Sequence, residues 1–259
     1  RDLRMSRGLG DVYKRQGRNI ALTTYGEALQ NALTPVLKTL HQIPTQLQQM
    51  ALEREKTIRL NVLAASTLVT QALISYKKDH DGLHFRLIQN SQCEDADITV
   101  FTRENFQIPT DTKERYELFK ERIFLAVPHN SPYASEESVR LQDFAHEDFI
   151  SLSGSRSIRT ICDRYCMQAG FVPHIIYESD SPDTVKNLIA SGLGVGFWPH
   201  YTWGMDSMEQ IRLLPIAEPT CQRAIILQLH RHARGQEAVC SFYAFLSRYL
   251  RQLKAAEQH

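Results

Sequence analysis

Two short runs of small hydroxyl residues stand where a predicted strand gives way to a predicted helix. The first run contains Ser66 and Thr67, and the second contains Ser153 and Ser155. Hydroxyl side chains suit the start of a helix because they accept hydrogen bonds from its first backbone N–H groups. Those N–H groups, at the positive end of the helix dipole, also bind anions. Capping alone explains either turn, whereas two equivalent turns facing one crevice predict a site for a small organic anion.

Three more residues are candidates for the same crevice. Thr102 follows a predicted strand at residues 97–101, so its hydroxyl is expected to reach the site. Phe197 and Trp198 end a short apolar strand and are expected to close the crevice with apolar surface. Such a surface favours a ligand that has a hydrophobic portion.

The sequence has no residue pattern typical of catalysis or metal binding. None of its ten histidines stands at a metal-binding spacing such as H-E-x-x-H. The run Ser153-Gly154-Ser155 matches neither a nucleophile elbow nor a phosphate-binding loop. We therefore expect no catalytic residue, no metal ligand and no cofactor, although turnover of a ligand would revive the hypothesis of an enzyme.

Composition limits the classes of partner. The 259 residues carry a net charge of +1, from 30 basic and 29 acidic side chains. This balance does not favour nucleic-acid binding over the whole chain, so a DNA-binding role must rest on a local segment. No apolar run reaches the roughly 18 residues that span a bilayer, and no signal peptide is visible, so we expect no membrane partner. An odd set of five cysteines without framework spacing predicts reduced thiols in a cytoplasmic protein.

Cys162 and Cys166 raise the alternative of a redox sensor. They are four residues apart on a predicted helix and therefore share one face. That geometry holds the two thiols apart, and the neighbours Ile161, Tyr165 and Met167 indicate burial. We therefore favour a structural role for both cysteines.

Strands and helices alternate through most of the chain. Strands are predicted at residues 58–63, 85–89, 97–101, 123–127, 148–152, 175–177, 195–198, 212–215 and 223–229, and helices at 68–78, 158–169, 183–191 and 236–253. Alternation of this kind predicts an α/β protein with parallel sheets built from strand–helix–strand units. The pattern occurs in two successive runs, which predicts two subdomains.

A long helix is predicted ahead of these runs. Thr24 and Glu27 fit a capping box that begins the helix. Pro35 and Pro44 each remove a backbone donor inside the pattern, so bends are expected there. A charged run at residues 53–56 predicts a break and a linker after the helix.

The apolar residues of this helix recur at alternating steps of four and three, the spacing of a coiled-coil seam. The seam consists of Leu29, Leu33, Val36, Leu40, Ile43, Leu47 and Met50. An apolar stripe this long ahead of a separate domain needs a partner surface, which favours dimerisation. The alternative is an amphipathic helix that packs on its own domain.

Three stretches resemble the LysR family of transcriptional regulators. Residues 17–27, GRNIALTTYGE, resemble the signature G-R-x-x-x-L-T-x-x-G-E, where the wing of a winged helix-turn-helix enters the linker helix. Residues 58–66 resemble the strand that opens the effector domain of the family. Residues 184–199, TVKNLIASGLGVGFWP, resemble the family block V-x-x-x-V-x-x-G-x-G-(I/V)-x-x-x-P.

Glycines give the third block a physical basis. Gly192 is expected to end a helix in the left-handed conformation. Gly194 and Gly196 are expected to allow close backbone approach at a strand that borders the crevice.

The resemblance implies an architecture. It implies a periplasmic-binding-protein-like effector domain of two α/β subdomains joined by two crossing strands, preceded by a long linker helix and a remnant of a winged helix-turn-helix. The wing remnant and linker helix are placed at residues 17–56 and the effector-binding domain at 57–259. Subdomain I is placed at about 57–127 and 200–259, and subdomain II at about 128–199.

The resemblance also implies a function, that of a bacterial LysR-type DNA-binding regulator that senses a small-molecule effector, which we expect to be a small organic anion. The implied partners are the effector, DNA and further copies of the chain in a homodimer or homotetramer. Arg18, in the wing, is the candidate for a DNA phosphate contact, with a solvated surface arginine as the alternative.

Residues 1–16 match no part of the family pattern and show no periodicity, so we expect them to be non-native and most of the DNA-binding domain to be absent. The alternative function is that of a solute-binding protein or stand-alone ligand-binding module of periplasmic-binding-protein type. An upstream reading frame that encodes a helix-turn-helix would decide between the two.

Overall fold

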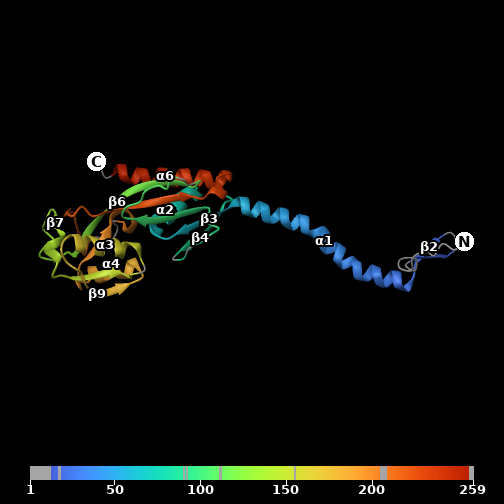
Figure 1. Ribbon diagram of the computed structural model, residues 1–259, viewed down its shortest axis with the longest axis horizontal. Coiled ribbons are helices and arrows are strands. Elements are labelled where there is room, and N and C mark those ends of the chain that lie inside the picture. The colour runs from blue at the N-terminus through green and yellow to red at the C-terminus, as the bar shows by residue number, and fades with distance from the viewer. Residues whose placement is uncertain are drawn as a thin grey trace. The chain divides into compact units, whose positions relative to one another are not determined.

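The computed structural model describes residues 13–16, 19–89, 91, 93–110, 113–154, 156–204 and 209–256. By its internal contacts the chain divides into an N-terminal unit, Arg1–Glu55, and a C-terminal unit, Lys56–His259. Each unit is described by itself (Figure 1). Among the described residues, no helix is both long and apolar enough to cross a membrane.

The N-terminal unit contains a strand pair and all of a long helix except its last residue. Strand β1 (Tyr13–Gln16) pairs antiparallel with β2 (Asn19–Leu22), and helix α1 (Thr24–Lys56) follows. Residues 1–16 show no periodicity that predicts an element, yet Tyr13–Gln16 form a strand. Residues 1–12 and Arg18 lie outside the described residues.

Thr23, not Thr24, caps helix α1. The backbone N–H of Gly26 donates to Thr23 Oγ1 at 3.2 Å, and the N–H of Glu27 donates to Thr23 O at 2.8 Å. Gly26 thus occupies the third helical position, so the predicted pairing of Thr24 with Glu27 is wrong by one residue.

Helix α1 is longer than the sequence predicted. It continues past Pro35 and Pro44 and through the charged residues 53–56, and β3 begins at once at Thr57. The predicted break at 53–56 is therefore wrong. Charged side chains are good helix formers when they face solvent, so a charged run does not by itself end a helix.

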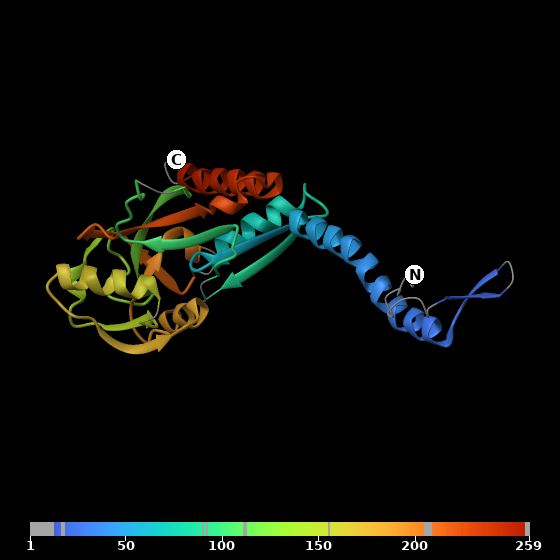
Figure 2. The ribbon, with the colours of Figure 1, turned by 45° about the vertical axis from the view of Figure 1, so that its right-hand side comes forward.

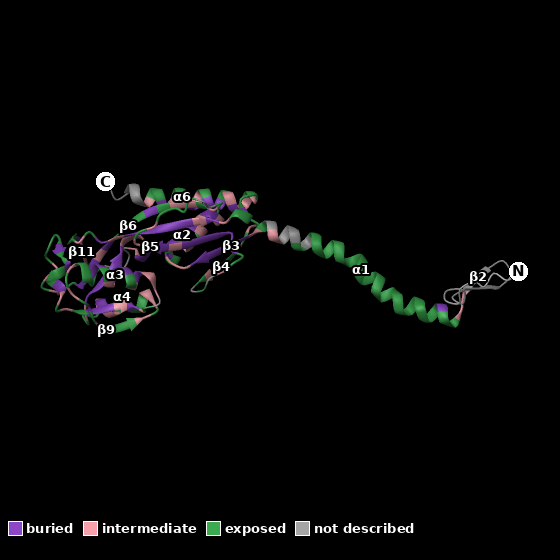
Figure 3. Cartoon of the chain, viewed as in Figure 1, coloured by how far each residue is buried: buried purple, intermediate pink, exposed green. Residues whose placement is uncertain are grey.

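The apolar seam of α1 is exposed along its length (Figure 3). Its members have exposed fractions of 40–65%: Leu29, Leu33, Val36, Leu40, Ile43, Leu47 and Met50. Among the described residues of the N-terminal unit, none covers the seam.

The C-terminal unit begins with a mixed sheet of seven strands. The neighbours run β10-β6-β13-β5-β3-β4, and β11 also pairs with β6. The bounds are β3 Thr57–Val62, β4 His84–Gln89, β5 Ile98–Arg103, β6 Arg115–Pro128, β10 Gly196–Pro199, β11 Ile211–Leu214 and β13 Gln222–Leu229. Strands β3, β4 and β5 are parallel, as predicted, whereas β13 is antiparallel to both β5 and β6.

Helices α2 (Ser66–Lys77) and α6 (Glu237–Ala256) complete the first hydrophobic core with this sheet (Figure 2). The two helices meet at Tyr76, whose ring lies 5.0 Å from that of Phe242 and whose hydroxyl donates to Ser241 Oγ at 2.9 Å. Strands β3, β5 and β13 contribute most of the buried residues of the sheet to this core.

The second core surrounds a smaller parallel sheet of β8 (Asp148–Leu152) and β9 (His174–Ser179). The remaining elements are β7 Val139–Arg140, 3-10 helix η1 Leu141–Phe144, α3 Ser157–Gln168, α4 Pro182–Ala190, α5 His200–Trp203, β12 Ile216–Glu218 and 3-10 helix η2 Arg231–Ala233. Trp203, Ile211 and Cys221 belong to this second core, although the sequence analysis placed residues 200–259 in subdomain I.

Strand β6 runs through both cores. Its residues up to Arg122 pair with β13, and from Ile123 onward it pairs with β10 and then β11. The sequence analysis predicted only residues 123–127 of this strand. The first half alternates charged and apolar side chains and therefore lacks the apolar run by which the second half was found.

Glycines shape the turn between α4 and β10. Gly192 has φ +79°, its N–H donates to Ile189 O and that of Leu193 donates to Leu188 O, which is a Schellman motif. A Cβ at Gly196 would lie 2.8 Å from Ile150 O, and one at Gly194 would lie 2.6 Å from the carbonyl oxygen of Asp148. The predicted roles of the three glycines in turn formation and close approach are confirmed.

Candidate effector site

A cavity of about 350 Å3 lies in the C-terminal unit, between residues of the first core and residues of the second. Its lining residues come from the ends of β3 and β8, from three helix starts and from β13. They are Val62, Leu63, Ala64, Ala65, Ser66, Thr67, Gln89, Leu152, Arg156, Ser157, Ile158, Asp180, Ser181, Pro182, Lys186, Thr202, Trp203 and Arg223. The volume is at the small end of the range for small-molecule sites, about 300–1,000 Å3.

The first turns of three helices line this cavity. Ser66 begins α2, Ser157 begins α3, and Ser181 caps α4. Each helix start carries a partial positive charge on its first backbone N–H groups. Three such ends around one cavity favour an anion over a cation.

The turn into α2 is built around a backbone conformation and not around a side-chain cap. Ala65 precedes the helix with φ 61°, in the left-handed region, and no side chain accepts from the first N–H groups. The hydroxyls of Ser66 and Thr67 are exposed at the cavity and do not cap this helix. Helix capping therefore does not account for the hydroxyl groups of Ser66 and Thr67.

The charged lining is mainly cationic. Lys186 Nζ donates to Trp203 O at 2.9 Å and lies 5.8 Å from the centre of the Trp203 ring. Arg156 Nη2 donates to Asp180 O at 3.1 Å. With Arg223, three cations thus face a cavity lined by one carboxylate, that of Asp180.

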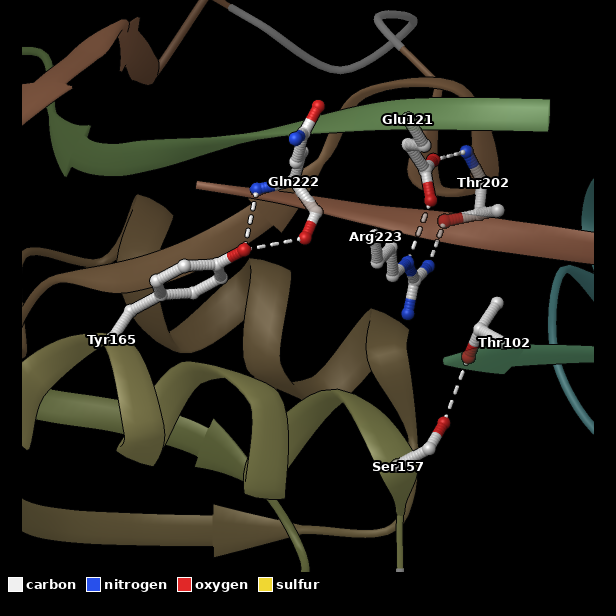
Figure 4. A network of polar contacts seen from close by, with 7 residues as sticks. All are labelled: Thr102, Glu121, Ser157, Tyr165, Thr202, Gln222 and Arg223. Carbon is white, nitrogen blue, oxygen red and sulfur yellow. Dashed lines mark hydrogen bonds and ion pairs between the residues drawn. The ribbon is translucent and has the colours of Figure 1, made fainter. Parts of the chain in front are cut away.

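Arg223 belongs to a buried polar network (Figure 4). Its Nε donates to Glu121 Oε2 at 2.7 Å, and its Nη2 donates to Thr202 Oγ1 at 2.7 Å. The backbone N–H of Thr202 donates to Glu121 Oε1, also at 2.7 Å. The network joins β6, β13 and α5, so it ties one wall of the cavity to the strands that both cores share.

A second set of contacts joins the two cores. Thr102 Oγ1 and Ser157 Oγ are 2.8 Å apart, and Arg164 pairs with Glu104. Thr102 is 1% exposed, so its hydroxyl contacts the start of α3 instead of the cavity.

The predicted site residues have different places in the structure. Ser66 and Thr67 line the cavity. Ser153 is not among its lining residues, and its N–H donates to Ser179 O at 2.8 Å. Ser155 lies outside the described residues. At the start of α3 it is Ser157, further along the chain, that reaches the cavity.

Phe197 and Trp198 are core residues and do not line the cavity. Phe197 stacks on Phe149, and Trp198 is 0% exposed with its Nε1 donating to Gly204 O at 3.0 Å. The aromatic residue that lines the cavity is Trp203. Three lining residues, Trp203, Lys186 and Arg223, were not predicted: Lys186 lies at a variable position of the third family block, and Trp203 and Arg223 belong to no motif.

Burial makes the helix cysteines poor nucleophiles. It raises the pKa of Cys166 to about 12 and that of Cys162 well above its usual value. Because the thiolate is the reactive form, both thiols stay protonated and slow to oxidise at neutral pH. Among the described residues, no group of three potential metal ligands comes together.

The profile of the LysR substrate binding domain matches residues 52–251. The chain therefore belongs to the LysR family. It is a LysR-type transcriptional regulator with an effector-binding domain.

Curated relatives are regulators from Bacillus subtilis (strain 168). The chain is 26% identical over 222 residues to the uncharacterized HTH-type transcriptional regulator YybE, covering 83% of this chain and 75% of that protein. It is 24% identical over 255 residues to the transcriptional dual regulator GltC, covering 94% of this chain and 84% of that protein. These relatives are transcriptional regulators and not enzymes.

Solved structures share the fold. The effector binding domain of QuiR in complex with shikimate has a TM-score of 0.61 at 18% identity, covering 76% of this chain and 97% of that one. The Synechocystis PCC6803 CcmR regulatory domain in complex with 2-PG has a TM-score of 0.63 at 15% identity, covering 74% of this chain and 95% of that one. The periplasmic-binding-protein-like fold of the effector domain is thus confirmed.

Proposed function

We propose that the cavity between the two cores binds a small organic anion and that this binding regulates transcription. One observation carries the proposal: three helix N-termini and three cationic side chains surround a single cavity of about 350 Å3. Preorganised N–H groups and cations in a crevice of this kind bind carboxylates and phosphates. The structures of QuiR with shikimate and CcmR with 2-PG, which share the fold, support a small-molecule effector.

A thermal-shift screen of the whole chain tests this proposal. The panel contains shikimate, other hydroxy and keto acids, and amino acids. A ligand present at 100 times its Kd stabilises the folded state by about 2.7 kcal/mol, so a hit raises Tm. If no member of a broad anion panel raises Tm, the proposed effector site is refuted.

The variant Ser66→Ala then tests whether a ligand found in this screen binds in the cavity. Loss of a hydrogen bond to a charged group weakens binding by about 1.5–3 kcal/mol, or roughly ten- to hundred-fold. The matched control is Ser138→Ala, because Ser138 is exposed and does not line the cavity. Equal affinity of both variants, measured by calorimetry, would place the ligand elsewhere.

We also propose that β1 and β2 form the wing of a winged helix-turn-helix and that Arg18 contacts a DNA phosphate. The order strand–strand–helix and membership of the LysR family support this assignment. Arg18→Gln is expected to reduce the slope of log K against log salt by about one without changing sequence preference. A regulator that acts on bacterial DNA works in the cytoplasm, which is where we place it.

We further propose that two chains pair through the α1 seam into a homodimer, which effector-domain contacts can extend to a tetramer. The exposed apolar seam supports pairing, because a helix of this length with an uncovered stripe gains stability from a partner.

A further inference from the structure

Arg223 differs from the other cations of the cavity in its burial. It is 4% exposed, although it lines the cavity, and it stands on β13 directly opposite Glu121 on β6. Lys186 and Arg156 instead donate to the backbone carbonyl oxygens of Trp203 and Asp180. Arg223 is therefore the cation whose position the fold fixes most closely.

Glu121 sets the orientation of the Arg223 guanidinium. This carboxylate is 0% exposed and holds Arg223 Nε with one oxygen and the Thr202 N–H with the other. Thr202 in turn accepts from Arg223 Nη2. A planar guanidinium held at two nitrogens cannot rotate, so its remaining N–H groups have a fixed direction.

The third nitrogen, Nη1, is directed away from both of these partners (Figure 4). Among the described residues, no hydrogen bond to Nη1 accompanies those at Nε and Nη2. Nη1 and the second hydrogen of Nη2 form a fork of two parallel donors. A carboxylate matches this fork with two charge-assisted hydrogen bonds.

We propose that Arg223 binds a carboxylate group of the effector and that Glu121 is its positioning residue. The inference rests on the proposed effector function of the cavity. Glu121 pairs with Arg223, and Asp183 pairs with Lys186 at 3.6 Å. Recognition of the carboxylate therefore rests on the fixed geometry of the Arg223 fork and not on the net charge of the cavity.

Acetate is the minimal probe of this fork, and neutral acetamide is its matched control. The whole chain is prepared with 15N-labelled arginine, and acetate is titrated at constant ionic strength. Acetate is expected to shift the Arg223 guanidinium signals saturably, whereas acetamide is expected to leave them in place. No saturable shift, or an equal shift with acetamide, would overturn the proposal.

Variants must avoid leaving Glu121 buried without a partner, which strongly destabilises a fold. The double variant Arg223→Gln/Glu121→Gln removes both charges together, and Arg223→Lys keeps the charge but loses the fork. Each is expected to weaken acetate binding roughly ten- to hundred-fold. Arg140→Gln is the control, because Arg140 forms an exposed ion pair with Asp143 outside the cavity. Unchanged affinity in either folded variant contradicts the proposal, and the acetate–acetamide contrast decides it if neither variant folds.

The positioning role of Glu121 has its own spectroscopic signature. Separate signals are expected for the Nη groups of Arg223 while Glu121 prevents rotation, and Glu121→Gln is expected to merge them. Separate signals in that variant would refute the positioning role.

The two proposals fail in different ways. An effector from the screen that leaves the Arg223 signals unshifted refutes the carboxylate fork and retains the sensing function. Acetate bound at Arg223 with no effector in the panel supports the fork and refutes the sensing function.

Discussion

Helices α1 and α6 are both long and amphipathic, but among the described residues of its own unit only α6 has its apolar face covered. The apolar face of α6 lies in the first core, with Phe242 and Leu246 0% exposed. The seam of α1 remains open, with Leu33 44% and Leu40 55% exposed. The difference teaches that apolar spacing predicts a buried face without saying whose surface buries it. For α6 that surface belongs to the same chain, and for α1 we propose that it belongs to a second copy.

The sharpest test of this comparison replaces both Leu33 and Leu40 with Asp. Charges placed in an apolar interface cost several kcal/mol each, so sedimentation is expected to show monomers in place of dimers. The folding of the C-terminal unit is expected to remain unchanged. Asn31→Asp with Gln42→Asp is the matched control, since it adds the same charge on the opposite face of α1. An unchanged oligomer in the Leu33/Leu40 variant would mean that the seam is not the interface.

Phe242→Ala on α6 is expected to have the converse effect. Removing a fully buried ring lowers the free energy of unfolding by about 3–5 kcal/mol, which urea denaturation measures. Association through α1 is expected to persist in the folded protein. Arg248→Ala, on the exposed face of α6, serves as the control. A stability loss no greater than that of the control would show that α6 is not part of the core.

Alkaline pH is expected to lower the stability of the C-terminal unit by a smaller amount, while the association of α1 stays unchanged. Burial raises the pKa of Cys166 and of Cys221 to about 12, while unfolded thiols ionise near 9. Between these values the unfolded state binds fewer protons, so stability falls as pH rises, by up to about 1.4 kcal/mol per pH unit for each thiol. The helix α1 contains no cysteine, so its association is expected to change little.

Urea denaturation at pH 8 and pH 10 measures this loss. The burial of Tyr243 raises the pKa of that residue and adds to the effect in the same direction. Cys166→Ala with Cys221→Ala is therefore expected to reduce the pH dependence without abolishing it. Equal pH dependence in the variant and the native chain would exclude the two thiols as its source.

The sequence predicted most elements because their signals are local. Strand Asp148–Leu152 was predicted with its observed bounds, and the Gly192 turn was predicted from a single glycine after an apolar helix. Half of β6 was missed because the sheet buries Glu121, a residue type that normally faces water. Its burial depends on Arg223, a partner 102 residues away that no local pattern indicates.

The residues of the site also fall into those that a local sequence signal predicts and those that depend on distant partners. Ser66 and Thr67 were found because a hydroxyl between strand and helix is a local signal. Trp203 and Arg223 reach the cavity only through the pairing of β10 and β13 with β6, so local patterns could not place them. Phe197 and Trp198 were assigned to the crevice because their strand borders it, but the side chains pack inward.

Strand β6 has a mechanical consequence. It is one uninterrupted strand, and its pairing partner changes from β13 to β10 between Arg122 and Ile123. The two cores therefore cannot swing about a flexible loop at this point, and any opening of the cavity must twist β6 or break part of its ladder. A twisted strand resists in proportion to its deformation, so β6 acts as a torsion spring. Glu121 lies two residues before Ile123 and holds Arg223 in place. Any twist of β6 would therefore also move a ligand that is bound to Arg223.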